Sequence, residues 1–273
     1  MRSFLFICGV LGLLAFVNPE PVRKVPSTKE IEKDMVRIGP KLYISRYECT
    51  NEWYNRFLEH QSPNPGYRNL LPDTVCWRTY FPLSDLSSFY RQYFSNKVYS
   101  QYPVMSVSYE SALAFCKWLT ESYATGKGKI GKKVIFSLPT KEEWMASATY
   151  AKDTIFPWKG SDLRAKNGVY HANYRCVMEE AGQFKGEDVY YLTNYAADGY
   201  LFPAPVKTYN SNGRGLYQMS GNVSEMLETP GQHAGGGWDS PGFMLALKAP
   251  DQYAGITGPH PCIGFRVVAR VIE

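Results

Sequence analysis

The side chains best suited to nucleophilic catalysis or transition-metal binding are spread widely along the sequence. Five of the six cysteines follow Cys8, and they are Cys49, Cys76, Cys116, Cys176 and Cys262. The four histidines are His60, His171, His233 and His260. No Cys-x-x-Cys pair and no Cys/His cluster occurs, so the spacing typical of a zinc site is missing. An odd number of cysteines leaves at least one thiol free or paired with another chain.

A hydrolytic site is not indicated either. The sequence contains no Gly-x-Ser-x-Gly nucleophile elbow. Glu142 and Glu143 are neighbours on a predicted helix, so they point in different directions and cannot act as an opposed acid and base. Glu143 is explained as a capping residue, because Thr140 stands three positions before it. His171 is interpreted as a hydrogen-bonding residue of a loop.

Capping residues mark three helices that would position these side chains. Thr50, Ser108 and Thr140 each stand directly before a segment with apolar residues at helical spacing. The other predicted elements are a hairpin or strand over 39–49, a strand over 104–107, a long packed loop over 61–102 and a strand over 264–270. Residues 150–262 show almost no period. Loops of this length must be held by aromatic packing, disulfides or metal ions.

Composition bounds the class of protein. The chain has 273 residues, of which 44% are hydrophobic and 20% charged, with a formal net charge of +5. The chain is therefore long and apolar enough to bury a full hydrophobic core, and a disordered or coiled-coil chain is excluded. The one dense basic run, at 127–133, is interleaved with glycine and is interpreted as a solvated loop. Nucleic acid is not expected as a partner.

The N-terminus predicts export. Arg2 precedes the uncharged segment 4–17, which is too short to span a bilayer comfortably. We interpret residues 1–17 as an export signal or a membrane anchor, 18–36 as a linker or arm, and 37–273 as one domain. Cys8 follows Ile7, which is larger than the residue that usually precedes a lipidated cysteine. Secretion to a periplasm or cell surface is favoured, and membrane association through an uncleaved anchor is the alternative.

Several segments together resemble the formylglycine-generating enzyme family, also called the sulfatase-modifying factor domain. In chain order they are 47–54 (YECTNEWY), 102–104 (YPV), 114–119 (AFCKWL), 138–144 (LPTKEEW), 156–160 (FPWKG), 171–173 (HAN), 212–225 (NGRGLYQMSGNVSE), 235–238 (GGGW) and 264–266 (GFR). The resemblance implies one α+β domain with a C-type-lectin-like core, few regular elements and long packed loops.

Two further segments resemble a narrower group. Residues 71–77 (LPDTVCW) and the tyrosine-rich segment 89–102 are similar to envelope proteins of Bacteroidota that serve gliding motility and type IX secretion. This resemblance implies an outer-membrane-associated location. It also implies partners among other envelope proteins in a multi-subunit assembly.

The resemblance also shows which catalytic residues differ. The family's oxidases bind copper(I) with two cysteines that follow the Gly-Gly-Ser segment, because soft thiolates suit this ion. Matched on Gly235–Trp238, these positions hold Ser240 and Leu245, and Gly237 replaces the serine. We therefore expect no enzyme activity of this type. The alternatives are a formylglycine-generating cysteine oxidase and a calcium-dependent lectin-like module, although no Glu-Pro-Asn or Gln-Pro-Asp sugar motif occurs.

Calcium is the cofactor that the resemblance implies. Calcium binds six to eight oxygens from carboxylates, amides and carbonyls. The first implied site uses the side chains of Asn173 and Asp198 and the carbonyls of Tyr174 and Tyr200. The ligands of the second implied site are the side chains of Gln218 and Glu225 and the carbonyls of Gly221 and Val223. The alternative is that Asp198 and Glu225 only cap turns.

The family also suggests an expectation for the thiols. Its helix cysteine equivalent to Cys116 often pairs with one beside the last strand, where this sequence has Val267. We therefore predict that Cys116 is an unpaired core residue, with a bridge to Cys262 as the alternative. The sequence as a whole predicts a non-catalytic exported protein that acts as a structural or binding component of an envelope assembly.

Overall fold

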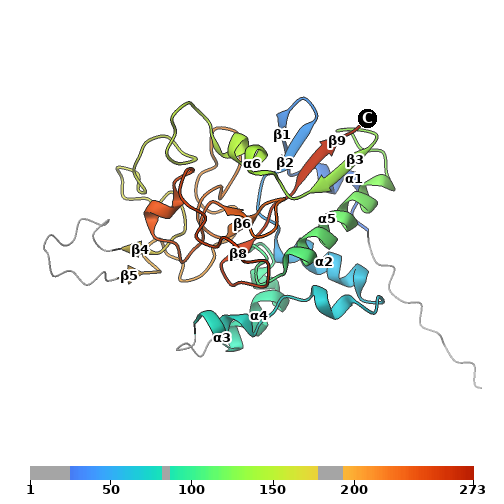
Figure 1. The fold of residues 1–273 in the computed structure, drawn as a ribbon, viewed down its shortest axis with the longest axis horizontal. Coiled ribbons are helices and arrows are strands. Elements are labelled where there is room, and N and C mark those ends of the chain that lie inside the picture. The colour runs from blue at the N-terminus through green and yellow to red at the C-terminus, as the bar shows by residue number, and fades with distance from the viewer. Residues whose placement is uncertain (1–24, 82–86, 178–192) are drawn as a thin grey trace, which may run out of the picture.

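A computed structural model describes residues 25–81, 87–177 and 193–273 (Figure 1). Its four-stranded antiparallel sheet has the order β1-β2-β9-β3, with bounds β1 Met35–Gly39, β2 Leu42–Ser45, β9 Val268–Val271 and β3 Val134–Ser137. β9 therefore lies between the early hairpin and β3, with Ile44 opposite Val268 and Phe136 opposite Ala269. Val268 and Ala269 are both buried, in different apolar clusters, so β9 is covered on both faces where it begins.

The three helices signalled by caps are confirmed. They are α2 Asn51–Gln61, α5 Tyr109–Ala124 and α6 Lys141–Ala148, and their N-caps are Thr50, Ser108 and Thr140. Glu143 completes a capping box with Thr140, because each side chain bonds the backbone N–H of the other residue. α5 packs against β3 and α2, and its apolar face forms part of the main core.

The segment 61–102 is not the long loop that the sequence predicted. It contains η1 Tyr67–Leu70, α3 Cys76–Tyr80, α4 Ser87–Ser95 and η2 Lys97–Tyr99. The ring of Trp77, on α3, is buried and stacks on Tyr90 of α4 with 4.2 Å between ring centroids. Aromatic burial holds this segment, and aromatic residues without a sequence period gave no helical signal.

The predicted strand over 104–107 is also wrong. Val104 forms a single backbone bond to the Cys49 carbonyl, and the chain then enters α5 without a ladder. Pro103 lacks the N–H that a ladder needs, and only an isolated bridge joins it to Thr50. The apolar residues are buried because they cross the core, not because they pair in a sheet.

The remaining elements are short, as expected for a domain with long packed loops. They are β4 Cys176–Val177, β5 Thr193–Asn194, β6 Ser224–Met226, β7 His233–Ala234, η3 Gly242–Leu245 and β8 Ile263–Gly264. β6 is the middle strand of a second sheet, antiparallel to β7 and parallel to β8. Helices and mixed sheets joined by irregular loops confirm the α+β class.

The expected arm contributes to the fold where it is described. Residues Thr28–Glu32 form α1, which Ser27 and Glu30 cap, and Ile31 is buried against the core. α1 packs on α5, and Tyr123 donates a hydrogen bond of 2.6 Å to Glu32. The predicted segment 1–17 lies outside the described residues. Among the helices of the described chain, none is long and apolar enough to cross a membrane.

Candidate functional site

Ser240 and Leu245 are both buried in the loop-rich half of the domain. Ser240 Oγ accepts a hydrogen bond of 2.8 Å from the Gly237 backbone N–H. Leu245, at the end of η3, packs in an apolar cluster with Phe156 and Tyr174. A Cβ built on Gly236 would lie 3.2 Å from Ser240 Oγ and 3.4 Å from Leu245 Cδ1. The side chains of Ser240 and Leu245 thus both lie beside Gly236, where they supply a hydroxyl and an alkyl group.

The fold brings Cys262 close to the segment of Ser240. The separation of these residues in the sequence gave no indication of this proximity. The Cβ of Cys262 lies 3.4 Å from the Cβ position of Gly237, and its thiol bonds the carboxylate of Asp239. The same carboxylate accepts the Tyr253 hydroxyl. Burial raises the pKa of the Cys262 thiol well above its usual value, and the negative charge of Asp239 adds to the shift. The thiolate form of Cys262, which is the form that binds copper, is therefore disfavoured in the metal-free protein.

Asp198 and Asn173, the side chains of the first implied calcium site, meet at Tyr209. The Tyr209 hydroxyl bonds Asp198 Oδ2 and the Asn173 side chain, while Asp198 Oδ1 accepts from the Tyr200 backbone N–H at 3.1 Å. Asn173 also donates to the Phe202 carbonyl at 3.0 Å. Burial raises the pKa of Asp198, and no cation stands among the groups that shift it. A half-buried carboxylate without a cationic partner fits a calcium ligand.

The two side chains of the second implied site, Gln218 and Glu225, differ in how well they could bind calcium. Neither polar side-chain atom of Gln218 has a hydrogen-bond partner among the described residues, although Gln218 is buried. The carboxylate of Glu225 is fully engaged, because Arg266 contacts both of its oxygens and Trp144 Nε1 donates to Oε2 at 2.7 Å. Gln218 therefore fits an oxygen ligand. Glu225 fits one only if the ion shares the carboxylate with Arg266.

A second buried carboxylate lies beside this ion pair. Glu48 accepts hydrogen bonds from Asn222 Nδ2 at 2.7 Å and from the Val223 backbone N–H at 3.2 Å. Burial raises its pKa well above the usual value, the Glu225 charge adds to the shift, and Arg266 opposes it. Burial therefore favours the protonated form of Glu48, while Glu225 forms the ion pair with Arg266.

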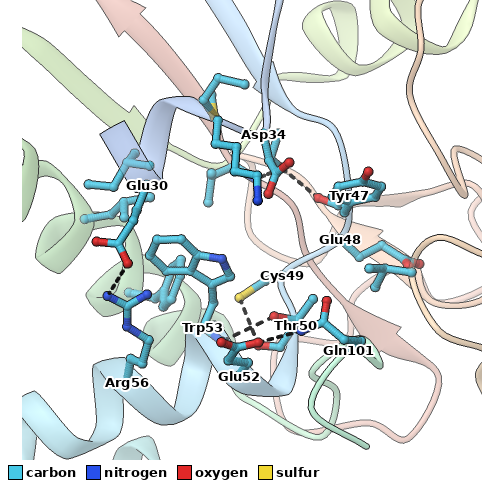
Figure 2. Close-up of a pocket in the computed structure, with 18 of the residues that line it drawn as sticks. Glu30, Asp34, Tyr47, Glu48, Cys49, Thr50, Glu52, Trp53, Arg56 and Gln101 are labelled. Atoms are coloured by element: carbon cyan, nitrogen blue, oxygen red, sulfur yellow. Dashed lines mark hydrogen bonds and ion pairs between the residues drawn. The ribbon is translucent and has the colours of Figure 1, made fainter. Parts of the chain in front are cut away.

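A cavity of about 270 Å³ lies between α1, the start of β1, the segment leading from β2 to α2, and α2 itself. We call it the α1–α2 cavity. Figure 2 shows Cys49 near its centre, with Asp34 and Glu52 on opposite sides and Trp53 forming one wall. Gln101 and Lys207, from segments far along the chain, also line it. No sequence motif indicated this cavity, because its residues come from separate parts of the sequence.

Comparison with known proteins identifies the domain. A profile of the family described as sulfatase-modifying factor enzyme 1-like domain matches residues 20–271. The chain belongs to this family. The sulfatase-modifying factor domain therefore extends over nearly all described residues, including α1 and the α1–α2 cavity.

Three curated relatives are formylglycine-generating enzymes. The mouse enzyme is 34% identical over 127 residues, which are 46% of this chain and 27% of the relative. The enzyme from Thermomonospora curvata is 32% identical over 45% of this chain and 32% of its own length. The Streptomyces coelicolor enzyme is 29% identical over 58% and 39%, respectively. The chain thus spans between about a quarter and two-fifths of these relatives.

Two solved structures align with most of the chain. CarF aligns with a TM-score of 0.48 and 20% identity over 85% of this chain and 87% of its own. Treponema denticola variable protein 1 aligns with a TM-score of 0.49 and 18% identity over 84% of each chain.

Proposed function

We propose that this sulfatase-modifying factor domain does not oxidise cysteine and acts instead as a binding component of an exported, envelope-associated assembly. The observation that carries the first half is the side-chain chemistry at Ser240 and Leu245. A copper(I) ion needs soft ligands, and here it would meet a hydroxyl already bonded to Gly237 and an alkyl group packed in the core. Cys262 does not replace the pair, because its thiol is buried and bonded to Asp239.

Formylglycine generation is the alternative, since the named relatives carry that activity. The direct test is oxidation of a sulfatase-type cysteine peptide by the purified chain with copper and oxygen. The Thermomonospora curvata enzyme is the positive control, and copper alone is the blank. We expect no turnover above the copper blank. Turnover that disappears in a Cys262→Ser variant would assign the oxidation to this chain and refute the proposal.

The envelope role is supported by the predicted export segment 1–17 and by the resemblance of 71–77 and 89–102 to Bacteroidota gliding and type IX secretion proteins. Phe89 and Tyr90 of the second segment contact the buried ring of Trp77, so the two segments pack together in the α3–α4 region of the fold. The test is fractionation of the native cell followed by pull-down in mild detergent. Recovery with outer-membrane proteins at constant stoichiometry is expected. Recovery as a lone cytoplasmic protein would contradict the proposal.

Calcium is proposed as a structural ion. Asn173, Asp198 and the carbonyls of Tyr174 and Tyr200 would hold one ion, and Gln218 with the carbonyls of Gly221 and Val223 would hold another beside Glu225. When bound, calcium would supply positive charge to loops that have few backbone ladders. The residues themselves tie these loops together, as the bond from Asn222 N to the Asn173 carbonyl shows.

A further inference from the structure

We propose that the α1–α2 cavity binds an alkylammonium or alkylguanidinium group, the chemistry shared by lysine and arginine side chains and by free polyamines. The cavity volume of about 270 Å³ equals the share of roughly nine liquid waters. That is more space than the heavy atoms of an arginine side chain require. The proposal rests on the cavity alone and does not depend on the proposed absence of oxidase activity.

The first argument is the pair of carboxylates, Asp34 and Glu52, that line the cavity. Asp34 and Glu52 stand on opposite sides of the cavity (Figure 2), and neither forms an ion pair within the described part of the chain. Asp34 is half-buried, which strengthens its attraction for a cation. Glu52 is exposed; its Oε2 accepts from Gln101 Nε2, and its Oε1 has no hydrogen-bond partner among the described residues. An ammonium or guanidinium group between them would satisfy both carboxylates.

The second argument is that two cations of the lining are already engaged. Arg56 pairs with Glu30 at 3.5 Å and lies over the Trp53 ring at 4.8 Å from its centroid. Lys207 Nζ lies 5.0 Å from the centroid of the Tyr47 ring. Arg56 and Lys207 are held by these contacts, and neither forms an ion pair with Asp34 or Glu52 among the described residues. Lys33 is exposed, and its long stem keeps the ammonium group in water.

The third argument is the apolar part of the lining. Ile31, Phe115, Leu119 and Val267 are buried core residues that also line the cavity. Their surface would contact the methylene stem of an alkylamine, while Asp34 and Glu52 would bind its cationic group. A hydrated metal ion gains nothing from such a surface. Apolar contact combined with two carboxylates therefore selects an organic cation.

Calorimetric titration of the full chain tests the proposal directly. The probes are cadaverine and agmatine as free amines, and acetyl-Gly-Lys-Gly-amide and its arginine analogue as peptide sources. Pentanoate and a norleucine peptide match the stem without the positive charge. We expect saturable one-to-one binding of the cationic probes only, and tighter binding of the peptides than of the free amines would identify a polypeptide source. Equal binding of pentanoate, or no saturable binding of any amine, overturns the proposal.

Charge-neutral variants separate the site from general effects on the fold. Asp34→Asn and Glu52→Gln should each weaken amine binding about tenfold, the equivalent of one charge-assisted contact. Glu59→Gln changes an exposed carboxylate of the same helix outside the cavity and should leave affinity unchanged. Lys207→Gln removes a cation from the lining and should tighten binding severalfold, a gain that loss of the contact with the Tyr47 ring cannot produce. Equal affinity across the wild type and these variants refutes the proposal.

Discussion

The guanidinium group of Arg266 and the carboxylate of Glu225 form a fully buried ion pair, with Nη2 and Oε1 2.5 Å apart. Arg266 also donates to the carbonyls of Ser45 and Tyr217, so one side chain joins β2, the 217–218 segment and β6. Glu48, the second buried carboxylate nearby, depends on the same positive charge. The pair therefore organises the junction between the two sheets.

Replacing Arg266 by methionine should destabilise the domain strongly. Arg266→Met keeps most of the side-chain volume but leaves Glu225 and Glu48 buried without their cation. Removing one partner of a buried pair costs about 3–5 kcal/mol of unfolding free energy. Urea unfolding followed by tryptophan fluorescence measures this loss. The control is Lys117→Gln, which breaks the exposed pair with Glu121 and should cost less than about 0.5 kcal/mol. Similar losses in both variants would contradict the argument.

Calcium should stabilise the loop-rich half of the domain. A ligand that binds only the folded state adds about 2.7 kcal/mol at a hundredfold excess over its Kd. Chelation should lower Tm by several degrees, and Asp198→Ala should remove most of that response. Glu225→Ala should remove a smaller part of it, since the Glu225 carboxylate is shared with Arg266. Unchanged wild-type melting on chelation, with no calcium found by elemental analysis, would leave these carboxylates as turn caps.

Gln218→Ala is the sharper test of the second calcium site. Because neither polar atom of the Gln218 side chain has a partner in the part of the chain that the structure describes, its truncation should remove no hydrogen bond from the calcium-free protein. We expect the variant to match the wild type under chelation and to be less stable only when calcium is present. Lower stability in the calcium-free state instead would assign Gln218 a packing role.

Acid should destabilise the domain through His260. Burial lowers the pKa of His260 to about 4 from the usual 6.5, and the neighbouring His233 contributes. The folded state therefore binds fewer protons than the unfolded state. The contribution of neutral His260 to the free energy of unfolding is fully present above pH 6.5 and is lost as the pH falls from 6.5 to 4. The loss amounts to about 3 kcal/mol when the shift is converted at 1.36 kcal/mol per pKa unit. His260→Asn keeps an acceptor for the Cys262 backbone N–H and should flatten the pH profile. An unchanged slope would exclude His260 as the cause.

Cys116 should remain a free thiol in the native protein. It is buried on α5 and forms no disulfide among the described residues, and burial raises its pKa to about 12. Alkylation with iodoacetamide should therefore label Cys116 only after unfolding. Mass mapping after native-state labelling gives the result. A Cys116–Cys262 bridge in the digest would contradict the prediction.

Local signals in the sequence were sufficient for the capped helices and for the class of fold. Thr50, Ser108 and Thr140 determine where their helices begin through side-chain bonds to residues three positions ahead, which a linear pattern records. The strand predicted for 104–107 was wrong because buried apolar residues satisfy a core and a sheet alike. The sequence offered no way to distinguish these two environments there.

The candidate site was predictable only where family motifs mark it. Ser240 and Leu245 were matched to the family's two cysteine positions through Gly235–Trp238, and the structure places both side chains beside Gly236. The bond from Cys262 to Asp239 and the α1–α2 cavity were missed, because they join residues such as Asp34 and Lys207 that only tertiary packing brings together. Side-chain periodicity carries no information about contacts of this range.

The central position of β9 has a consequence for the order of folding. Residues 268–271 are made long after β2 and β3, yet both strands need them as their hydrogen-bonding partner. Until synthesis has passed residue 271, the hairpin and β3 each present an unpaired edge, and the four-stranded sheet cannot close. The four-stranded sheet can therefore form only after all of its strands have been synthesised. A nascent chain that pauses before residue 271 keeps these unpaired edges accessible to chaperones.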